Sequence, residues 1–226
     1  MPWVADVAEV EPDGRKRKGA RSRAAILERA MAIASTEGLE GLSIGRLATD
    51  LGASKSGVFA QFGSKEELQL ATVDAARGVF IATSVLPALE GPPGIRRLWA
   101  LARCFADYAG KVFEGGCFFQ AAAAEFDSRP GRVRDAVAAG LADWRRLHVD
   151  TIREGQALGE IRPEVDAELL AYELDAYARL ANTDSLLHDD AGAFDHARRA
   201  TLERLRSVTT DPDLLPSTAA PRGASR

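Results

Sequence analysis

Cysteine and histidine are both scarce in this sequence, with two and three copies among 226 residues. Cys104 and Cys117 are not spaced as C-x-x-C, and His148, His188 and His196 form no metal-ligand pattern with them. We interpret both cysteines as small, buried or half-buried hydrophobic residues rather than as a redox pair or a metal site. The sequence therefore predicts neither a metal nor another cofactor.

Uncharged apolar runs of about 18 residues or more, long enough to span a membrane, are also missing. Residues 1–13 contain four acidic side chains and no basic one, which is the reverse of a secretory signal. No arrangement of Ser, His and Asp, and no glycine-rich phosphate loop after a strand, indicates an enzyme. We expect a cytoplasmic protein that is not an enzyme and has no membrane partner.

Strand patterns are absent as well, because no segment alternates apolar and polar residues and Ala, Leu, Arg and Glu dominate. Apolar periodicity and the Gly, Pro and capping signals predict an all-α fold of about nine helices. The expected helices cover about residues 21–37, 43–51, 54–62, 64–84, 95–113, 118–126, 128–158, 164–187 and 191–207. Ser64 and Glu67 form a predicted capping box, and Pro130 is expected in the first turn of a helix capped by Asp127 or Ser128.

Charge is unevenly distributed along the chain, whose net charge is −4. Residues 1–13 carry −4, residues 14–66 carry +5 and residues 67–226 carry −5. A basic block on an acidic body suggests a head that faces an anion. Residues 1–20 and 209–226 lack apolar periodicity, and we predict that both segments are disordered.

Residues 43–62 combine the features of a helix-turn-helix. Two short helices are joined by a tight turn at Gly52. Their apolar residues suffice to dock both helices on the first one: Ile44, Leu47, Ala48, Leu51, Val58 and Phe62. The second helix opens with Ser54, Lys55, Ser56 and Gly57, and such an N-terminus can enter the major groove of DNA.

This region resembles the tetracycline-repressor (TetR) family of transcriptional regulators. The matching residues are Gly41, Ser43, Leu47, Ala48, Leu51, Gly52, Ser54, Lys55, Gly57, Phe59, Phe62, Lys65 and Leu68. So many matches at fixed spacing are far more specific than a lone glycine-rich turn. Residues 116–131 also look like the sensor domain of a TetR subgroup.

The resemblance implies that Ser43 contacts a phosphate, that residues 54–57 lie at the groove and that Lys65 clamps the DNA backbone. Lys55 and Gln61 are the best candidates for bonds to bases or phosphates. The family usually has tyrosine at the position of Phe59 and histidine at that of Gln61, which leaves the operator sequence open. The predicted DNA-binding residues are Arg21, Ser43, Arg46, Ser54, Lys55, Ser56, Gly57, Phe59, Gln61 and Lys65.

A basic arm formed by residues 15–18 with Arg21 and Arg23 could follow the minor groove or the phosphates. Alone, such a run is equally well a solvated tail, and the three-helix unit could serve packing or protein contact. Combined with the motif, the arm favours DNA binding. We therefore predict a disordered basic arm (1–20), a helix-turn-helix DNA-binding domain (21–66), a ligand-sensing and dimerisation domain (67–208) and a disordered tail (209–226).

Inward-facing aromatic residues are concentrated between residues 64 and 187. Core filling explains most of them, and the alternative is an apolar cavity that binds a neutral or cationic small molecule. The predicted ligand-binding residues are Trp99, Tyr108, Phe119, Gln120, Trp144, His148 and Tyr172, with Asn182 as a further polar candidate and Cys104 and Cys117 beside the cavity.

Leucine stripes on residues 164–187 and 191–207 are wider than one core needs, which predicts a homodimer through these two helices. A dimer would present two reading helices to double-stranded DNA, so a palindromic operator is expected. Ligand binding would move the fourth helix and release the protein from DNA, and repression is favoured over activation. An enzyme and a helical interaction protein without DNA contact are the alternatives from other classes, while the effector and the regulated genes stay open.

Overall fold

The computed structural model describes residues 14–218, with side chains from residue 19 on. Within this range the α-helices are α1 (Gly14–Glu37), α2 (Ile44–Asp50), α3 (Lys55–Phe62), α4 (Lys65–Phe80), α5 (Leu86–Leu89), α6 (Ile95–Lys111), α7 (Phe118–Phe126), α8 (Arg132–Ala157), α9 (Ala167–Leu187) and α10 (Ala193–Val208). The shorter turns are the 3-10 helices η1 (Leu39–Gly41) and η3 (Pro212–Leu214) and the π-helical turn η2 (Ile81–Val85). If the continuous run of α4, η2 and α5 counts as one helix, the described residues form nine helices and no strand, which confirms the all-α prediction.

Serine side chains start the helices of the head and the long helix that follows it. Ser43, Ser54 and Ser64 have an extended backbone, and each hydroxyl accepts a hydrogen bond of 3.1 Å from the N–H three residues later. The predicted starts of α2, α3 and α4 are therefore confirmed. The serine half of the predicted capping box is formed, because the Ser64 hydroxyl caps α4. The Glu67 carboxylate bonds to Arg132 of α8 instead.

The predicted disorder is wrong at both edges of the described range. α1 begins at Gly14, so that residues 14–20 extend the first helix, which their Lys, Arg and Ala residues favour. At the other end, Thr209 forms an isolated antiparallel bridge with Ile161, and Leu215 is buried in a core cluster. The burial of this leucine orders the chain beyond α10. Residues 1–13 and 219–226 lie outside the described residues.

Two helix starts also differ from the prediction. α8 begins at Arg132, and Asp127 is the residue that ends α7 rather than the cap of α8. Pro130 disfavours a helical conformation for the residue before it, which explains the later start. α9 begins at Ala167, where the Asp166 side chain caps the first free N–H groups.

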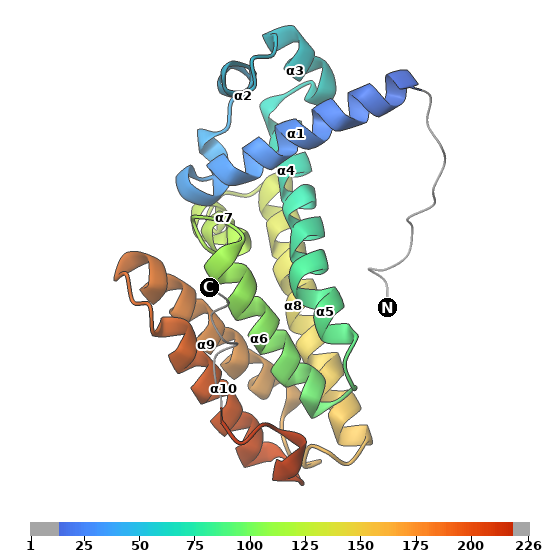
Figure 1. The fold of residues 1–226 in the computed structure, drawn as a ribbon, viewed down its shortest axis with the longest axis vertical. Helices are drawn as coiled ribbons and strands as arrows, with labels where there is room; N and C mark the ends of the chain where they lie inside the picture. Colours follow the sequence, from blue (N-terminus) through green and yellow to red (C-terminus); the bar gives the residue numbers. More distant parts are fainter. Residues whose placement is uncertain (1–13, 219–226) are drawn as a thin grey trace, which may run out of the picture.

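Figure 1 shows a small head, made of α1, α2 and α3, at one end of a longer helical body. α4 runs from the head into the body, α7 lies beneath α1, and α9 and α10 pair on the side away from α5. One core cluster is continuous from Leu47 and Val58 in the head to Phe80 and Trp144 in the body. The head is therefore packed on the body through a shared core rather than tethered to it.

One helical stretch, Lys65–Leu89, is long and apolar enough to cross a membrane by length and composition. The core helix of a soluble protein passes the same test. Here Leu68 and Ala76 are fully buried, and Arg77 forms an ion pair of 2.7 Å with Asp143 of α8. We interpret the stretch as a core helix.

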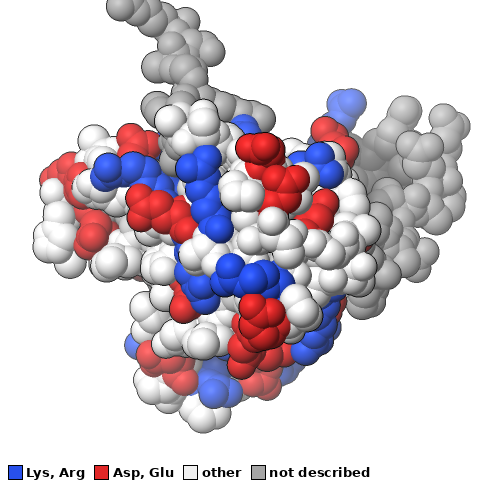
Figure 2. All heavy atoms as spheres, turned by 90° about the horizontal axis from the view of Figure 1, so that it is seen from below, with Lys and Arg blue, Asp and Glu red and all other residues white. Residues whose placement is uncertain are grey.

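The end of the body opposite the head carries both signs of charge. Figure 2 shows this face with Lys and Arg interspersed among Asp and Glu. Near the start of α6 and the end of α8, Arg96 pairs with Glu160 at 3.5 Å. Because positive charge is not concentrated here, this end does not suit a polyanion.

Candidate nucleic-acid interface and ligand cavity

The helix-turn-helix is a docked unit rather than a loose extension. Leu47 and Ala48 of α2 and Val58 and Phe62 of α3 are no more than 8% exposed. Gly52, which follows α2, has φ +61°, a left-handed conformation that favours glycine and lets the chain reverse tightly. The predicted helix-turn-helix is therefore confirmed in its architecture.

The first turn of α3 projects into solvent. Ser54, Lys55, Ser56 and Gly57 are all exposed, and the Ser54 hydroxyl lies 3.2 Å from that of Ser56. One turn later, the Phe59 side chain is exposed as well, at 54%. α3 therefore presents short polar groups, one cation and an aromatic ring on an open surface.

Gln61, in the last turn of α3, is half-buried. Its carbonyl oxygen accepts a hydrogen bond of 2.7 Å from Arg23, whose guanidinium lies 4.4 Å from the centre of the Phe62 ring. Arg23 thus fixes the end of α3 on α1, a packing role that the sequence did not suggest. The side chains of residues 15–18, the rest of the predicted basic arm, lie outside the described part of the chain.

Two of the predicted DNA-contacting cations are held in ion pairs. Arg46 forms a two-point pair with Glu37, in which Nη2 lies 2.6 Å from Oε1. Lys65 Nζ lies 2.9 Å from Glu40 Oε2 and donates to the Glu40 carbonyl oxygen at 2.7 Å. The hydrogen bonds from Arg46 and Lys65 lower the pKa of the two glutamates, so both stay ionised at neutral pH. Contact of either cation with a phosphate requires an exchange of partners.

Arg21 and Lys55 are the predicted cations that are exposed and have no ion pair among the described residues. The Lys55 side chain crosses Gly45 of α2, whose ideal Cβ position lies 3.2 Å from Lys55 Cε. Ser43 is exposed too, although its hydroxyl oxygen caps α2. Lys55 is therefore the cation of α2 and α3 that is best placed to meet an anion.

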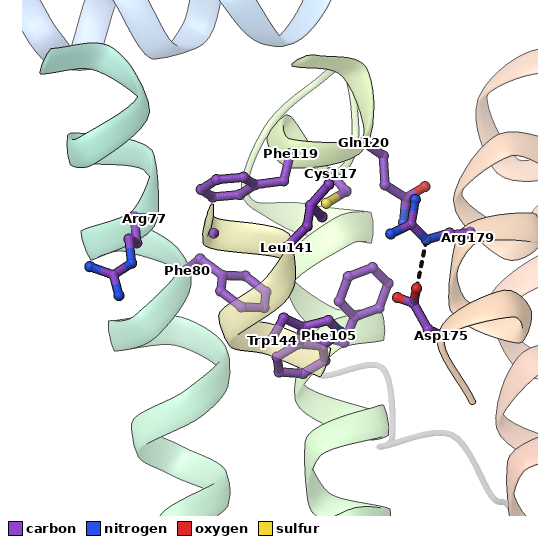
Figure 3. Close-up of a pocket in the computed structure, with 11 residues that line it drawn as sticks. Arg77, Phe80, Phe105, Cys117, Phe119, Gln120, Leu141, Trp144, Asp175 and Arg179 are labelled. Carbon is purple, nitrogen blue, oxygen red and sulfur yellow. Dashed lines mark hydrogen bonds and ion pairs between the residues drawn. The ribbon is translucent and has the colours of Figure 1, made fainter. Parts of the chain in front are cut away.

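A narrow cavity lies in the body below α7. Its volume is about 20 Å³, which leaves room for about one water molecule. It is lined by Arg77, Phe80, Phe105, Cys117, Phe119, Gln120, Gly140, Leu141, Trp144, Asp175 and Arg179. Figure 3 shows the aromatic rings gathered on one side, with Gln120, Arg179 and Asp175 forming a polar wall on the other.

Four of the predicted ligand-binding residues lie at this cavity or at its neighbour. Phe119, Gln120 and Trp144 line the cavity itself. His148 lines a second cavity of similar volume, about 20 Å³, which shares Trp144, Phe105 and Asp175 with the first. These shared side chains form the wall between the two cavities.

The other three predicted residues lie elsewhere. Tyr108 is buried behind the cavity, edge-on against Phe80 with ring centres 5.0 Å apart. Trp99 packs in the core cluster at the far end of the body. Tyr172 is 60% exposed, so its prediction as an inward contact is wrong. The inward face of α9 carries Leu170, and a position two residues along a helix points to the opposite side.

Burial favours the uncharged forms of three titratable groups near the cavities, those of Tyr108, Cys117 and His148. It raises the pKa of the Tyr108 hydroxyl and raises that of the Cys117 thiol to about 11. Burial also lowers the pKa of His148, whose Nδ1 lies 3.1 Å from the Trp144 carbonyl oxygen. Cys117 lines the cavity as predicted, whereas Cys104 does not. A protonated, buried thiol at Cys117 is a poor nucleophile at neutral pH.

The sequence interpretation missed the charged residues at the cavity. Asp175 and Arg179 form an ion pair of 2.8 Å on α9, and Arg77 pairs with Asp143. An acid and a base four residues apart usually decorate a solvated helix face, so the spacing gave no sign of a cavity. The predicted polar candidate Asn182 is used structurally, because its Oδ1 accepts a hydrogen bond of 2.8 Å from the Cys117 N–H.

Two family models match this chain, one in each part of the fold. Residues 26–72 match the model of bacterial regulatory proteins of the tetR family. Residues 94–201 match the tetracyclin repressor-like C-terminal domain. Together the two matches cover more than half of the chain. Among curated proteins, no relative matches.

Solved structures share the fold over most of its length. A TetR transcriptional regulator from Chloroflexus aurantiacus is 28% identical, with 85% of this chain and 98% of that one covered and a TM-score of 0.80. A TetR-family regulator from Cytophaga hutchinsonii is 20% identical, with coverage of 90% and 100% and a TM-score of 0.78. A putative regulator from Saccharomonospora viridis, solved in complex with choline, is 22% identical, with coverage of 85% and 100% and a TM-score of 0.70. The last two show the fold alone. With an exposed reading helix, an all-α body and a family match in each part, this chain belongs to the TetR family of DNA-binding transcriptional regulators.

Proposed function

We propose that this protein is a cytoplasmic, homodimeric repressor that binds a palindromic operator and leaves it when a small molecule occupies the body. The observation that carries the proposal is the exposed first turn of α3, which is rich in short polar groups and includes Lys55. At the opposite end of the molecule, Figure 2 shows Lys and Arg interspersed with Asp and Glu among the described residues.

The first turn of α3 is the proposed reading surface. Gly57 has no side chain to hold DNA away, and Ser54 and Ser56 can bond to base edges or phosphates. The exposed Phe59 ring can contact a thymine methyl group, although it cannot donate a hydrogen bond to phosphate. The proposed DNA contacts are completed by Arg21, Ser43, Arg46, Lys55, Gln61 and Lys65.

The outer face of α9 is the proposed dimer contact. Leu169, Tyr172, Leu180 and Leu187 are between 53% and 72% exposed, although all four are large and apolar. Their spacing places them on one side of the helix. Large apolar side chains exposed along one side of a helix are typical of an association surface. α10 packs along α9, so two copies would pair α9 and α10 into a four-helix interface and present two α3 helices to a twofold site.

The ligand that we propose is small, largely apolar and uncharged. The guanidinium groups of Arg77 and Arg179 are paired with Asp143 and Asp175, so no charge at the cavity calls for an ionic partner. Ligand sites usually measure about 300–1,000 Å³, far more than the volume of about 20 Å³ that this cavity has. Binding must therefore push the lining rings and helices apart, and that displacement is the signal we expect at the head.

The test uses a DNA duplex that the full-length protein selects from a random-sequence pool. We expect the selected sequence to be palindromic. Lys55→Ala should weaken binding and reduce the slope of log affinity against log salt by about one, as for the loss of one phosphate contact. Lys111→Ala, which removes an exposed lysine of the body, is the matched control and should change neither quantity. A protein that stays monomeric and selects no duplex would overturn the proposal.

A further inference from the structure

A carboxylate of the body holds the turn between α1 and α2. Glu125, near the end of α7, accepts hydrogen bonds from the N–H of Leu39 (2.7 Å) and from the N–H of Glu40 (2.8 Å). These two N–H groups open η1, the link between α1 and the helix-turn-helix. A single side chain of the body is therefore bonded to the head through two charge-assisted hydrogen bonds.

The same turn is held from its other side by α4. Gln69 Nε2 donates to the Leu39 carbonyl oxygen at 3.0 Å, and Lys65 Nζ donates to the Glu40 carbonyl oxygen at 2.7 Å. α7 thus holds the N–H groups of η1 while α4 holds its carbonyl groups. A displacement of α7 relative to α4 must therefore turn or distort η1.

Glycines allow the head to pack very closely against α7 and the loop before it. A Cβ on Gly38, where φ is +79°, would lie 2.6 Å from Glu125 Oε2. A Cβ on Gly115, in the loop before α7, would lie 1.7 Å from the Ser35 carbonyl oxygen of α1. The head therefore meets α7 and its preceding loop with no space for slippage.

The opposite side of α7 belongs to the cavity. Phe119 and Gln120 line the cavity, and the Cys117 N–H at the start of the helix is bonded to Asn182 of α9. α7 is thus a short helix that touches the cavity, the head and the helix we propose for dimer contact. Figure 1 shows it beneath α1.

We propose that Glu125 is the positioning residue through which occupancy of the cavity sets the orientation of the helix-turn-helix. The inference rests on the proposed function and adds a route to it. A ligand that displaces Phe119 moves α7, and the Glu125 carboxylate carries that movement to η1. On this route the displacement reaches η1 through α7, while Gln69 and Lys65 of α4 hold the carbonyl groups of the same turn.

A glycine in the cavity wall allows a test that needs no ligand. A Cβ on Gly140 of α8 would lie 2.6 Å from Phe119 Cε1, so Gly140→Ala pushes the same ring that a ligand would push. Leu141→Phe is a second wedge in the same wall, in case the first variant folds poorly. The control is Gly78→Ala in α4, which gains the same helix propensity but meets nothing within 4 Å.

Glu125→Gln breaks the contact between α7 and η1. It keeps the size and shape of the side chain but places an amide N–H group against one of the two backbone N–H groups. Glu90→Gln, at an exposed site, is its control. Two quantities are measured in full-length protein: amide exchange at residues 39 and 40, and affinity for the selected duplex. Coupling between sites usually amounts to 5–150-fold, so a wedge should change affinity by about fivefold or more and accelerate exchange at both amides. In the Glu125→Gln background, the wedge should change affinity by less than about twofold.

An equal change of affinity in both backgrounds would show that the signal bypasses Glu125, and the inference would fall. Wedges that alter neither exchange nor affinity would overturn it as well. If the wild-type protein selects no duplex, the proposed function fails instead, and amide exchange in the wedge variants still decides whether the cavity is coupled to η1.

Discussion

Replacing Asn182 by alanine should destabilise the body by breaking one buried hydrogen bond. Asn182 is 5% exposed, and it is the acceptor for the N–H of Cys117, itself 3% exposed. Alanine would leave this donor buried without an acceptor, at a cost of about 1–3 kcal/mol. For a chain of this length each kcal/mol lowers the unfolding midpoint by about 2–4 °C, so a decrease of about 2–12 °C is expected.

Thermal unfolding followed by circular dichroism measures this change, at one fixed protein concentration because dimerisation would shift the midpoint. Thr183→Ala is the matched control, since Thr183 is the next residue, is exposed and donates a hydrogen bond to the Arg179 carbonyl of its own helix. Its expected effect is within about 0.5 kcal/mol. An Asn182→Ala variant as stable as the wild type would refute the reasoning and return Asn182 to the candidate ligand contacts.

Three further substitutions or treatments test the two sites. Phe59→Tyr should tighten binding to the selected duplex severalfold in fluorescence anisotropy, because the exposed ring gains a hydroxyl for phosphate; weaker binding would argue against Phe59 at the DNA. Burial lowers the pKa of His148 below its ordinary value of 6.5, so below pH 6.5 the unfolded chain binds more protons than the folded one. The free energy of unfolding should therefore decrease as the pH falls from 6.5 towards the folded-state pKa, by at most about 1.4 kcal/mol per pH unit. Urea titrations should show a flatter pH dependence for His148→Gln, and an identical dependence would count against a buried neutral ring. Cys117, with a pKa raised to about 11, should resist iodoacetamide at pH 8 in the native protein, and rapid alkylation seen by mass spectrometry would mean that the cavity is open.

The head could be predicted from sequence because its signals are local. A serine cap, a glycine with positive φ and an apolar pair spaced for one helix face specify each short helix within a few residues. The exposed turn at Ser54 and Lys55 follows directly from that local geometry. The pairing of Arg46 with Glu37 does not, because it joins two helices whose relative placement depends on the core.

The cavity was harder to predict because α9 is apolar on two faces. Leu170 and Leu174 face the core, while Leu169 and Tyr172 face solvent, and hydrophobic periodicity alone does not say which face meets the body. The prediction of Tyr172 failed on this ambiguity. Tail ordering failed similarly, because the burial of Leu215 depends on a distant partner surface rather than on its neighbours in sequence.

Glu40 links the two mechanisms that the structure suggests, DNA contact and ligand response. Its N–H is held by Glu125 of α7, while its carboxylate and carbonyl oxygens hold Lys65, the proposed phosphate clamp. The proposed phosphate contact requires Lys65 to exchange Glu40 for a phosphate. Any movement of η1 that tightens or loosens the ion pair between Glu40 and Lys65 therefore changes how readily the Lys65 ammonium group can bind a phosphate. A displacement transmitted through Glu125 would change the orientation of α3 and would also change the strength of the proposed phosphate contact of Lys65. A small shift of α7 can therefore change the affinity for DNA in two ways.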